Sequence, residues 1–109
     1  MKTTINGIEW NIVLTHDRED LKRSDGSVTL GVTDLNCTTI FLWDGLHGDL
    51  LRKVLIHEMS HAFVFSYGYT ISVEEEEFLC SFIDTYAEDI ISESESLLLD
   101  RFKKMKNFS

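Results

Sequence analysis

The chain has 109 residues, a formal net charge of −9 and an apolar fraction of 43%, which predict a single soluble domain over residues 1–109. The acidic balance argues against a nucleic-acid partner, because phosphate contacts need clustered Lys and Arg. No apolar run reaches the ~20 residues of a membrane span, and the polar start of the chain shows no signal-peptide pattern. The two cysteines are widely spaced, so we expect free thiols, a cytoplasmic location and no membrane partner.

Three segments in the first half of the chain are rich in β-branched and aromatic residues. They predict strands over 8–14, 27–32 and 38–43. Turn-forming residues separate them, with Ser-Asp-Gly at 24–26 and a further turn at 34–36. All strands are therefore expected between residues 8 and 43.

Helices are expected in the second half. Apolar residues at helical spacing predict a helix over 49–67, and Gly68 is placed to end it as a C-cap glycine. Ser72, followed three residues later by a glutamate, predicts a capping box that starts a second helix over 73–92. Residues 94–109 either continue that helix or form a further helix or tail. Strands followed by helices predict an α+β fold, with a small, mostly antiparallel three-stranded sheet packed on a helical hairpin.

The first of these helices carries the motif His-Glu-Met-Ser-His. His57 and His61 are four residues apart, so on a helix both imidazoles point to one side and form half of a tetrahedral metal site. Glu58 projects about a quarter-turn away, where it can reach a water at the metal without being a ligand. The other two histidines, His16 and His47, lie in predicted loops, where a surface position is more usual.

A hydrolytic zinc site usually has three protein ligands and one open position, so a further ligand is needed. A third histidine close behind the motif is excluded, because positions 64 and 67 hold Val and Tyr. The remaining source is the run of four glutamates at 74–77, which opens the second helix. Glu76 and Glu77 lie deeper in that helix than the two before them, and periodicity alone does not separate these two candidates.

The segment LIHEMSHAF followed by EEEEFLCSFI resembles the small phage and prophage metallopeptidases of the ImmA/IrrE-like group and the single-domain minigluzincins. The resemblance implies a zincin-like fold, peptidase activity, and a Zn²⁺ ion held by His57, His61 and Glu77. In these families the glutamate ligand stands three residues before a small residue, which here is Cys80. An Asp or Asn one position further supports the site by hydrogen bonding, and Ser81 is a departure that bears on metal affinity and rate.

These observations predict a zinc metalloendopeptidase of the gluzincin type that acts on a peptide or protein substrate. Glu58 is expected to be the general base, and an extended peptide is expected to lie along the strand at 38–42. The alternative is a catalytically weak or inactive metal-binding interaction protein, which binds a phage or prophage regulator and has a closed fourth coordination position. A third hypothesis is a latent peptidase whose own terminal segment plugs the cleft. The oligomeric state is left open.

Overall fold

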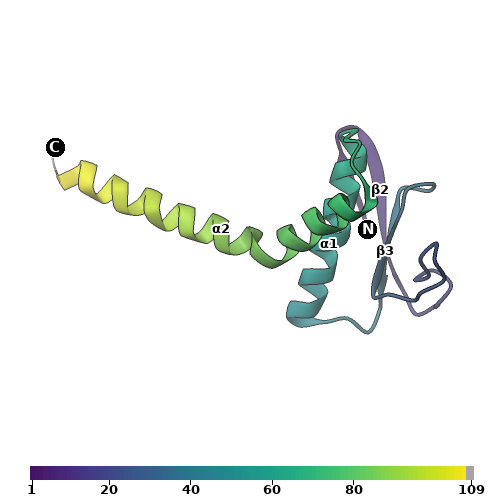
Figure 1. Ribbon diagram of the computed structural model, residues 1–109. Coiled ribbons are helices and arrows are strands. Elements are labelled where there is room, and N and C mark those ends of the chain that lie inside the picture. The colour runs from purple at the N-terminus through teal and green to yellow at the C-terminus, as the bar shows by residue number, and fades with distance from the viewer. Residues whose placement is uncertain (108–109) are drawn as a thin grey trace.

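The computed structural model describes residues 1–107, with side chains described through Lys103, and within this range it contains four strands and two helices (Figure 1). The elements in chain order are β1 (Lys2–Ile5), β2 (Ile8–Thr15), β3 (Gly31–Asp34), β4 (Thr39–Trp43), α1 (Gly48–Ser66) and α2 (Val73–Asn107). Helix α1 packs against the sheet, whereas α2 crosses α1 and then projects away from the rest of the molecule. The predicted α+β class is confirmed.

The sheet is mixed, with the strand order β1-β2-β4-β3. The pairs β1–β2 and β3–β4 are antiparallel, whereas β2 and β4 are parallel. The prediction of three mostly antiparallel strands therefore missed one strand and the parallel pair. The reason is tertiary: the chain leaves β2 for the far edge of the sheet, forms β3 there, and returns as β4 beside β2.

The missed strand is β1, whose polar residues carried little strand signal. It forms a hairpin with β2 through Asn6 and Gly7, both of which have positive φ, at 48° and 80°. An Asn-Gly pair favours this tight two-residue turn, because both residues tolerate the left-handed conformation. Ile5, the last residue of β1, is buried and gives the hairpin its contact with the core.

The strand predicted over 27–32 is displaced toward the C-terminus. Val28 makes only an isolated bridge with Lys22, and regular pairing begins at Gly31. The expectation that a peptide lies along 38–42 requires an edge strand there and is wrong, because β4 is hydrogen-bonded on both sides. The edge on this side of the sheet is β3.

The hydrophobic core lies between the sheet and α1. Trp10, Ile40, Leu42 and Ala62 are each at most 1% exposed. Trp10 also joins β2 to the end of α1, because its indole Nε1 donates a hydrogen bond to Ser66 Oγ at 2.8 Å. These contacts hold α1 in a defined position on the sheet.

Helix α1 occupies its predicted segment to within one residue at each end. Its C-terminus closes as a Schellman motif, in which Gly68 has a φ of +73°. The Gly68 N–H donates to Phe65 O at 3.0 Å, and the Tyr69 N–H donates to Val64 O at 3.1 Å. The predicted C-cap glycine is confirmed.

Helix α2 begins at its predicted cap, since the Ser72 hydroxyl accepts the backbone N–H of Glu75 at 3.1 Å. It then continues without a break through 92–95, where the sequence left open a second start. That segment contains no Pro or Gly, and the Ser94 hydroxyl donates to Ile90 O at 2.7 Å instead of capping a new helix.

Of the alternatives left open for 94–109, the structure shows the continuation of the helix that begins at 73, and residues 108–109 lie outside the described range. Within residues 1–107, neither helix combines the length and the apolar character that crossing a membrane requires.

Close contact between β3 and α1 requires glycine at position 31. A Cβ atom on Gly31 would lie 2.8 Å from Val54 Cγ1 and 3.0 Å from Glu58 Cγ. We expect Gly31→Ala to lower the free energy of unfolding by about 1–3 kcal/mol, because the added methyl overpacks this contact. Urea denaturation measures the change, with Ser81→Ala, at an exposed position, as the control. An unchanged midpoint for Gly31→Ala would show that the two elements are not packed this closely.

Candidate metal centre

The two motif histidines lie side by side on the surface of α1 that faces α2. Their ring centroids are 5.0 Å apart, and the side chains are only 14% and 12% exposed for His57 and His61. The spacing of four residues on a continuous helix produces this pairing, as the sequence predicted.

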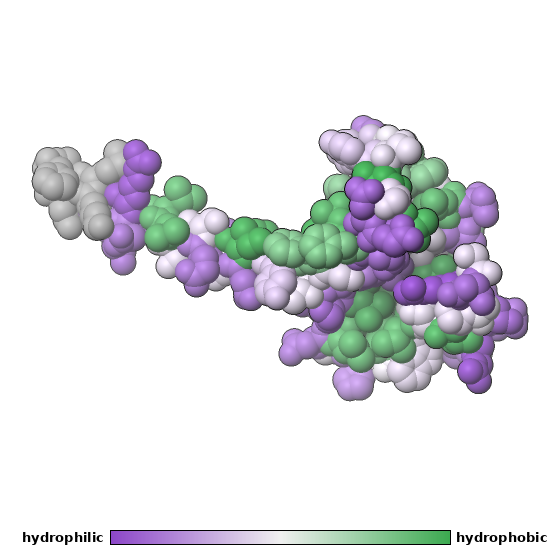
Figure 2. Space-filling model, in the orientation of Figure 1, coloured by the Kyte–Doolittle hydropathy of each residue, from purple (hydrophilic) through white to green (hydrophobic). Residues whose placement is uncertain are grey.

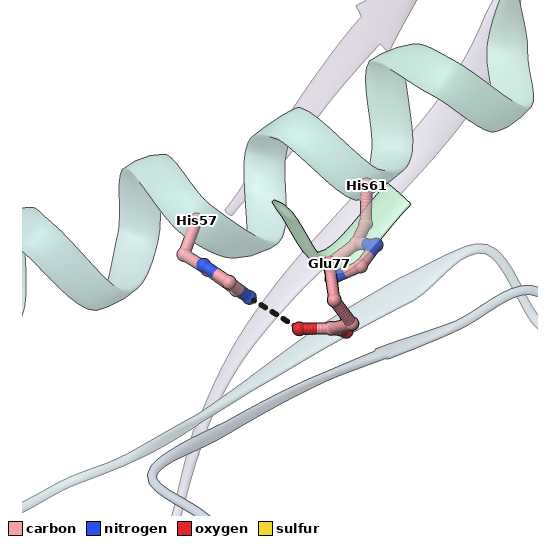
Figure 3. Close-up of side chains that lie close together, drawn as sticks. All are labelled: His57, His61 and Glu77. Carbon is pink, nitrogen blue, oxygen red and sulfur yellow. Dashed lines mark ion pairs between the residues drawn. The ribbon is translucent and has the colours of Figure 1, made fainter. Parts of the chain in front are cut away.

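Glu77 reaches the same point from the second turn of α2. Its two carboxylate oxygens lie 3.3 Å from His57 Nε2 and 3.0 Å from His61 Nε2 (Figure 3). Within residues 1–107, the residues whose ligand atoms converge as a potential metal-binding group are His57, His61 and Glu77, with those atoms all within 4.8 Å of one another.

Glu76, the other candidate, has a different place. Its carboxylate accepts a hydrogen bond from Nδ1 of His61 at 2.5 Å, on the side of the ring away from Glu77. The structure thus separates the two glutamates that periodicity left unresolved. Glu77 faces both Nε2 atoms, whereas Glu76 orients one ring from outside.

His57 is held in the same way by Asp84, whose carboxylate accepts a hydrogen bond from Nδ1 at 2.7 Å. The Asp84 side chain is 7% exposed and also accepts hydrogen bonds from Lys53 Nζ at 2.6 Å and Thr85 Oγ1 at 2.9 Å. Burial raises the pKa of Asp84, but the hydrogen bonds from Lys53, His57 and Thr85 outweigh it and hold the pKa below its ordinary value. Asp84 is therefore ionised at neutral pH.

Asp84 was not predicted as a site residue. The family resemblance implies a supporting residue at position 81, where Ser81 is exposed. Asp84 lies seven residues after Glu77, two turns along the same side of α2, and this spacing is the sequence signal that could have identified it. A carboxylate therefore orients His57 in spite of the departure at Ser81.

The donor set suits a zinc ion. Asp84 and Glu76 each accept a hydrogen bond from an Nδ1 atom, so the Nε2 atom is the ring nitrogen that faces Glu77 in both histidines. The two Nε2 atoms lie 3.0–3.3 Å from the Glu77 carboxylate oxygens, and a cation shared between them would be held by all three side chains. Two imidazole nitrogens and one carboxylate oxygen are the protein ligands of one class of zinc hydrolase.

Glu58 lies next to this group without joining it. Glu58 is 6% exposed, and one of its carboxylate oxygens accepts a hydrogen bond at 3.0 Å from Thr33 Oγ1 on β3. The same hydroxyl lies 3.0 Å from the backbone carbonyl of Glu58. Thr33 was not recognised in the sequence, because its contact crosses from the sheet to α1.

A groove of about 650 Å³ opens beside the histidine pair. Residues 31–36 of β3 and the following turn form one wall, and Glu58, His61, Glu76 and Glu77 contribute from the helices. The groove therefore runs between β3, the edge strand of the sheet, and the candidate metal centre.

The other two histidines lie away from this group, as do two tyrosines near the end of α1. His47 is the exposed N-cap residue of α1, and His16 forms an exposed ion pair with Asp44 at 3.4 Å. Tyr67 and Tyr69 line a separate apolar depression. Burial and the carboxylates around it raise the pKa of the Cys80 thiol to about 12, so this buried residue stays protonated and packs in the interior.

Known protein families, curated proteins and solved structures give no match to this chain. The fold and site define an α+β domain with a His–His–Glu group between two packed helices and a buried glutamate beside it. The motif and this geometry are thus the observations that bear on function.

Proposed function

We propose that this protein is a zinc-dependent metallopeptidase. The observation that carries the proposal is the convergence of His57, His61 and Glu77, next to a non-ligating Glu58 and an open groove. A structural metal site has no need for a buried carboxylate held beside its ligands, whereas hydrolysis requires a group that accepts a proton there.

His57 and His61 would hold the ion through Nε2, and Glu77 through its carboxylate. Zinc bound at these residues supplies a Lewis acid that lowers the pKa of water and polarises a carbonyl oxygen. Asp84 and Glu76 accept hydrogen bonds from the Nδ1 atoms, which orients both rings with Nε2 toward Glu77.

Glu58 would take a proton from the attacking water and pass it to the leaving amine. Thr33 donates to one of its carboxylate oxygens, which holds the side chain and leaves the other oxygen for the proton. Glu58 is 6% exposed and lines the groove, so its carboxylate would act on a bound substrate while most of the side chain is shielded from solvent.

The edge strand β3 is the element best suited to align a substrate. Its outer edge is unpaired in the described sheet, and Thr33 in it contacts Glu58. An extended peptide can add to such an edge through backbone hydrogen bonds, which fixes the scissile bond in register with the catalytic groups. The proposed substrate therefore lies along β3 and not along the neighbouring β4.

The resemblance to ImmA/IrrE-like peptidases and minigluzincins supports a protein substrate such as a phage or prophage regulator. A cytoplasmic location is consistent with such a substrate and with the absence of an apolar helix of membrane-spanning length within residues 1–107. The alternative hypothesis, a metal-binding interaction protein, requires a protein side chain at the fourth coordination position. The described residues bring three candidate ligands together.

Metal content tests the proposal directly. We expect the purified chain to bind one zinc ion per molecule, and His61→Ala to lose it, because two ligands do not hold the ion well. Mass spectrometry of the metal measures both, and His16→Ala, which removes a histidine outside the group, is the control.

Cleavage of a mixed peptide library should stop when zinc is removed by a chelator and return when zinc is added back. Failure to bind zinc, or equal zinc content in His61→Ala, would contradict the proposal, and zinc binding without cleavage would favour the alternative.

A further inference from the structure

The second half of α2 projects from the domain as an arm, residues 88–107 (Figure 1). Every side chain described in it, from Glu88 to Lys103, is exposed. The molecule measures 61 Å in its longest dimension against 31 and 26 Å in the others, which reflects this projection. The arm contacts the rest of the described domain through Glu88, whose carboxylate accepts a hydrogen bond from Arg52 Nε on α1 at 2.5 Å. Helices are stabilised in water mainly by packing of an apolar face, and the large apolar side chains of the arm stay exposed.

The arm is amphipathic. Its large apolar side chains are between 51% and 69% exposed: Ile90, Ile91, Leu97, Leu98, Leu99 and Phe102. Figure 2 shows hydrophobic patches along the arm, separated by polar surface. Ile90 and Leu97 are seven residues apart, as are Ile91 and Leu98, so these four share one side of the helix with Ser94 between them. A repeat of seven is the spacing by which two helices pack along a common seam.

Charge changes sign along the arm. Near the domain it carries acidic residues, Glu88, Asp89, Glu93 and Glu95, and the chain has no Lys or Arg from residue 74 to residue 95. Toward the tip the sequence is basic, with Arg101, Lys103, Lys104 and Lys106. A parallel pair of such helices would align acid with acid and base with base. An antiparallel pair brings the basic tip of each helix beside the acidic part of the other.

We propose that the arm is a self-association surface, on which the α2 helix of a second copy of this chain packs in antiparallel orientation. The symmetry is twofold, since each copy offers the same seam and the same charge order. With the axis near Ser94, Ile90 faces Leu98 of the second copy and Ile91 faces its Leu97. Arg101 then lies beside Ala87 and Glu88 of the second copy. The apolar side of the arm becomes buried, and the candidate metal centre takes no part in the contact.

Sedimentation equilibrium of the full chain over a wide range of concentration tests the association. We expect a dimer for the wild type and, for Leu97→Glu and Leu98→Glu, a dissociation constant raised by at least about 30-fold, because a charge is placed in the apolar seam. Ser96→Glu, on the opposite side of the helix, is the matched control and should leave the dimer intact. Circular dichroism verifies that each variant stays helical.

Cross-linking tests the orientation in a Cys37→Ser background, in which Cys80 is the remaining native cysteine and is buried. Ser94→Cys, near the axis, should form a disulfide-linked dimer under mild oxidation, because its two copies face each other. Arg101→Cys should cross-link poorly with itself and readily with Ala87→Cys in a mixture. A wild type that is monomeric throughout, or a dimer unaffected by the Leu97→Glu and Leu98→Glu changes, overturns the proposal. Self-cross-linking of Arg101→Cys equal to that of Ser94→Cys overturns the antiparallel arrangement.

Discussion

Glu58→Gln should leave zinc bound and reduce peptide cleavage by at least about 100-fold, since general base catalysis typically contributes 10²–10⁴-fold. The amide keeps the shape of the side chain and can still accept the Thr33 hydrogen bond, but it cannot take a proton from water. Cleavage of the peptide library, followed by mass spectrometry, measures the loss at equal zinc content.

The matched control is Glu74→Gln, the same chemical change at an exposed position in the first turn of α2. It should retain both zinc and cleavage. If Glu58→Gln cleaves as well as the wild type, Glu58 is not the general base. If it loses zinc as well, Glu58 acts in holding the ion, and the role assigned to Glu77 is in question.

The neighbouring glutamates Glu76 and Glu77 should behave differently when each is replaced by alanine. Glu77→Ala removes the carboxylate that faces both Nε2 atoms, so we expect zinc binding near neutral pH to be lost. Glu76→Ala removes a hydrogen bond to His61 Nδ1 from outside the group, so we expect zinc to bind about 10–100-fold more weakly. Competition with a chromogenic zinc chelator measures both affinities.

The comparison is informative because the two residues are adjacent and both variants remove one carboxylate from the same helical turn. Glu74→Ala serves again as the control and should bind zinc as the wild type does. Equal losses for Glu76→Ala and Glu77→Ala would show that the ion is not held as proposed. A larger loss for Glu76→Ala would exchange the two roles.

Local patterns were sufficient for the helices and for half of the candidate site. The spacing of His57 and His61 determines that both rings share one side of α1, whatever the rest of the chain does. The C-terminal end of α1 and the start of α2 followed from Gly68 and Ser72, because caps act within a few residues. The Asn6-Gly7 turn is also a local signal. It predicts a hairpin, and β1 was missed because this turn was not taken into account.

Contacts between segments that are distant in the sequence could not be predicted from local patterns. Glu76 and Glu77 are one residue apart, so the choice between them depends on how α2 crosses α1. Asp84 and Thr33 likewise acquire their partners through packing, since 27 residues separate Asp84 from His57 and 25 separate Thr33 from Glu58. Periodicity places a residue on one side of an element but does not state which element faces that side.

The sequence by itself determined the paired imidazoles, the α+β class, the C-terminal end of α1 and the start of α2, because each depends on spacing or capping within a few turns. The tertiary structure alone decided that Glu77 faces both rings, that Asp84 supports the site in place of Ser81, and that β3 is the edge beside it. These depend on the direction in which the chain returns from the far edge of the sheet and on the angle at which α2 crosses α1. Neither quantity is encoded in any single segment.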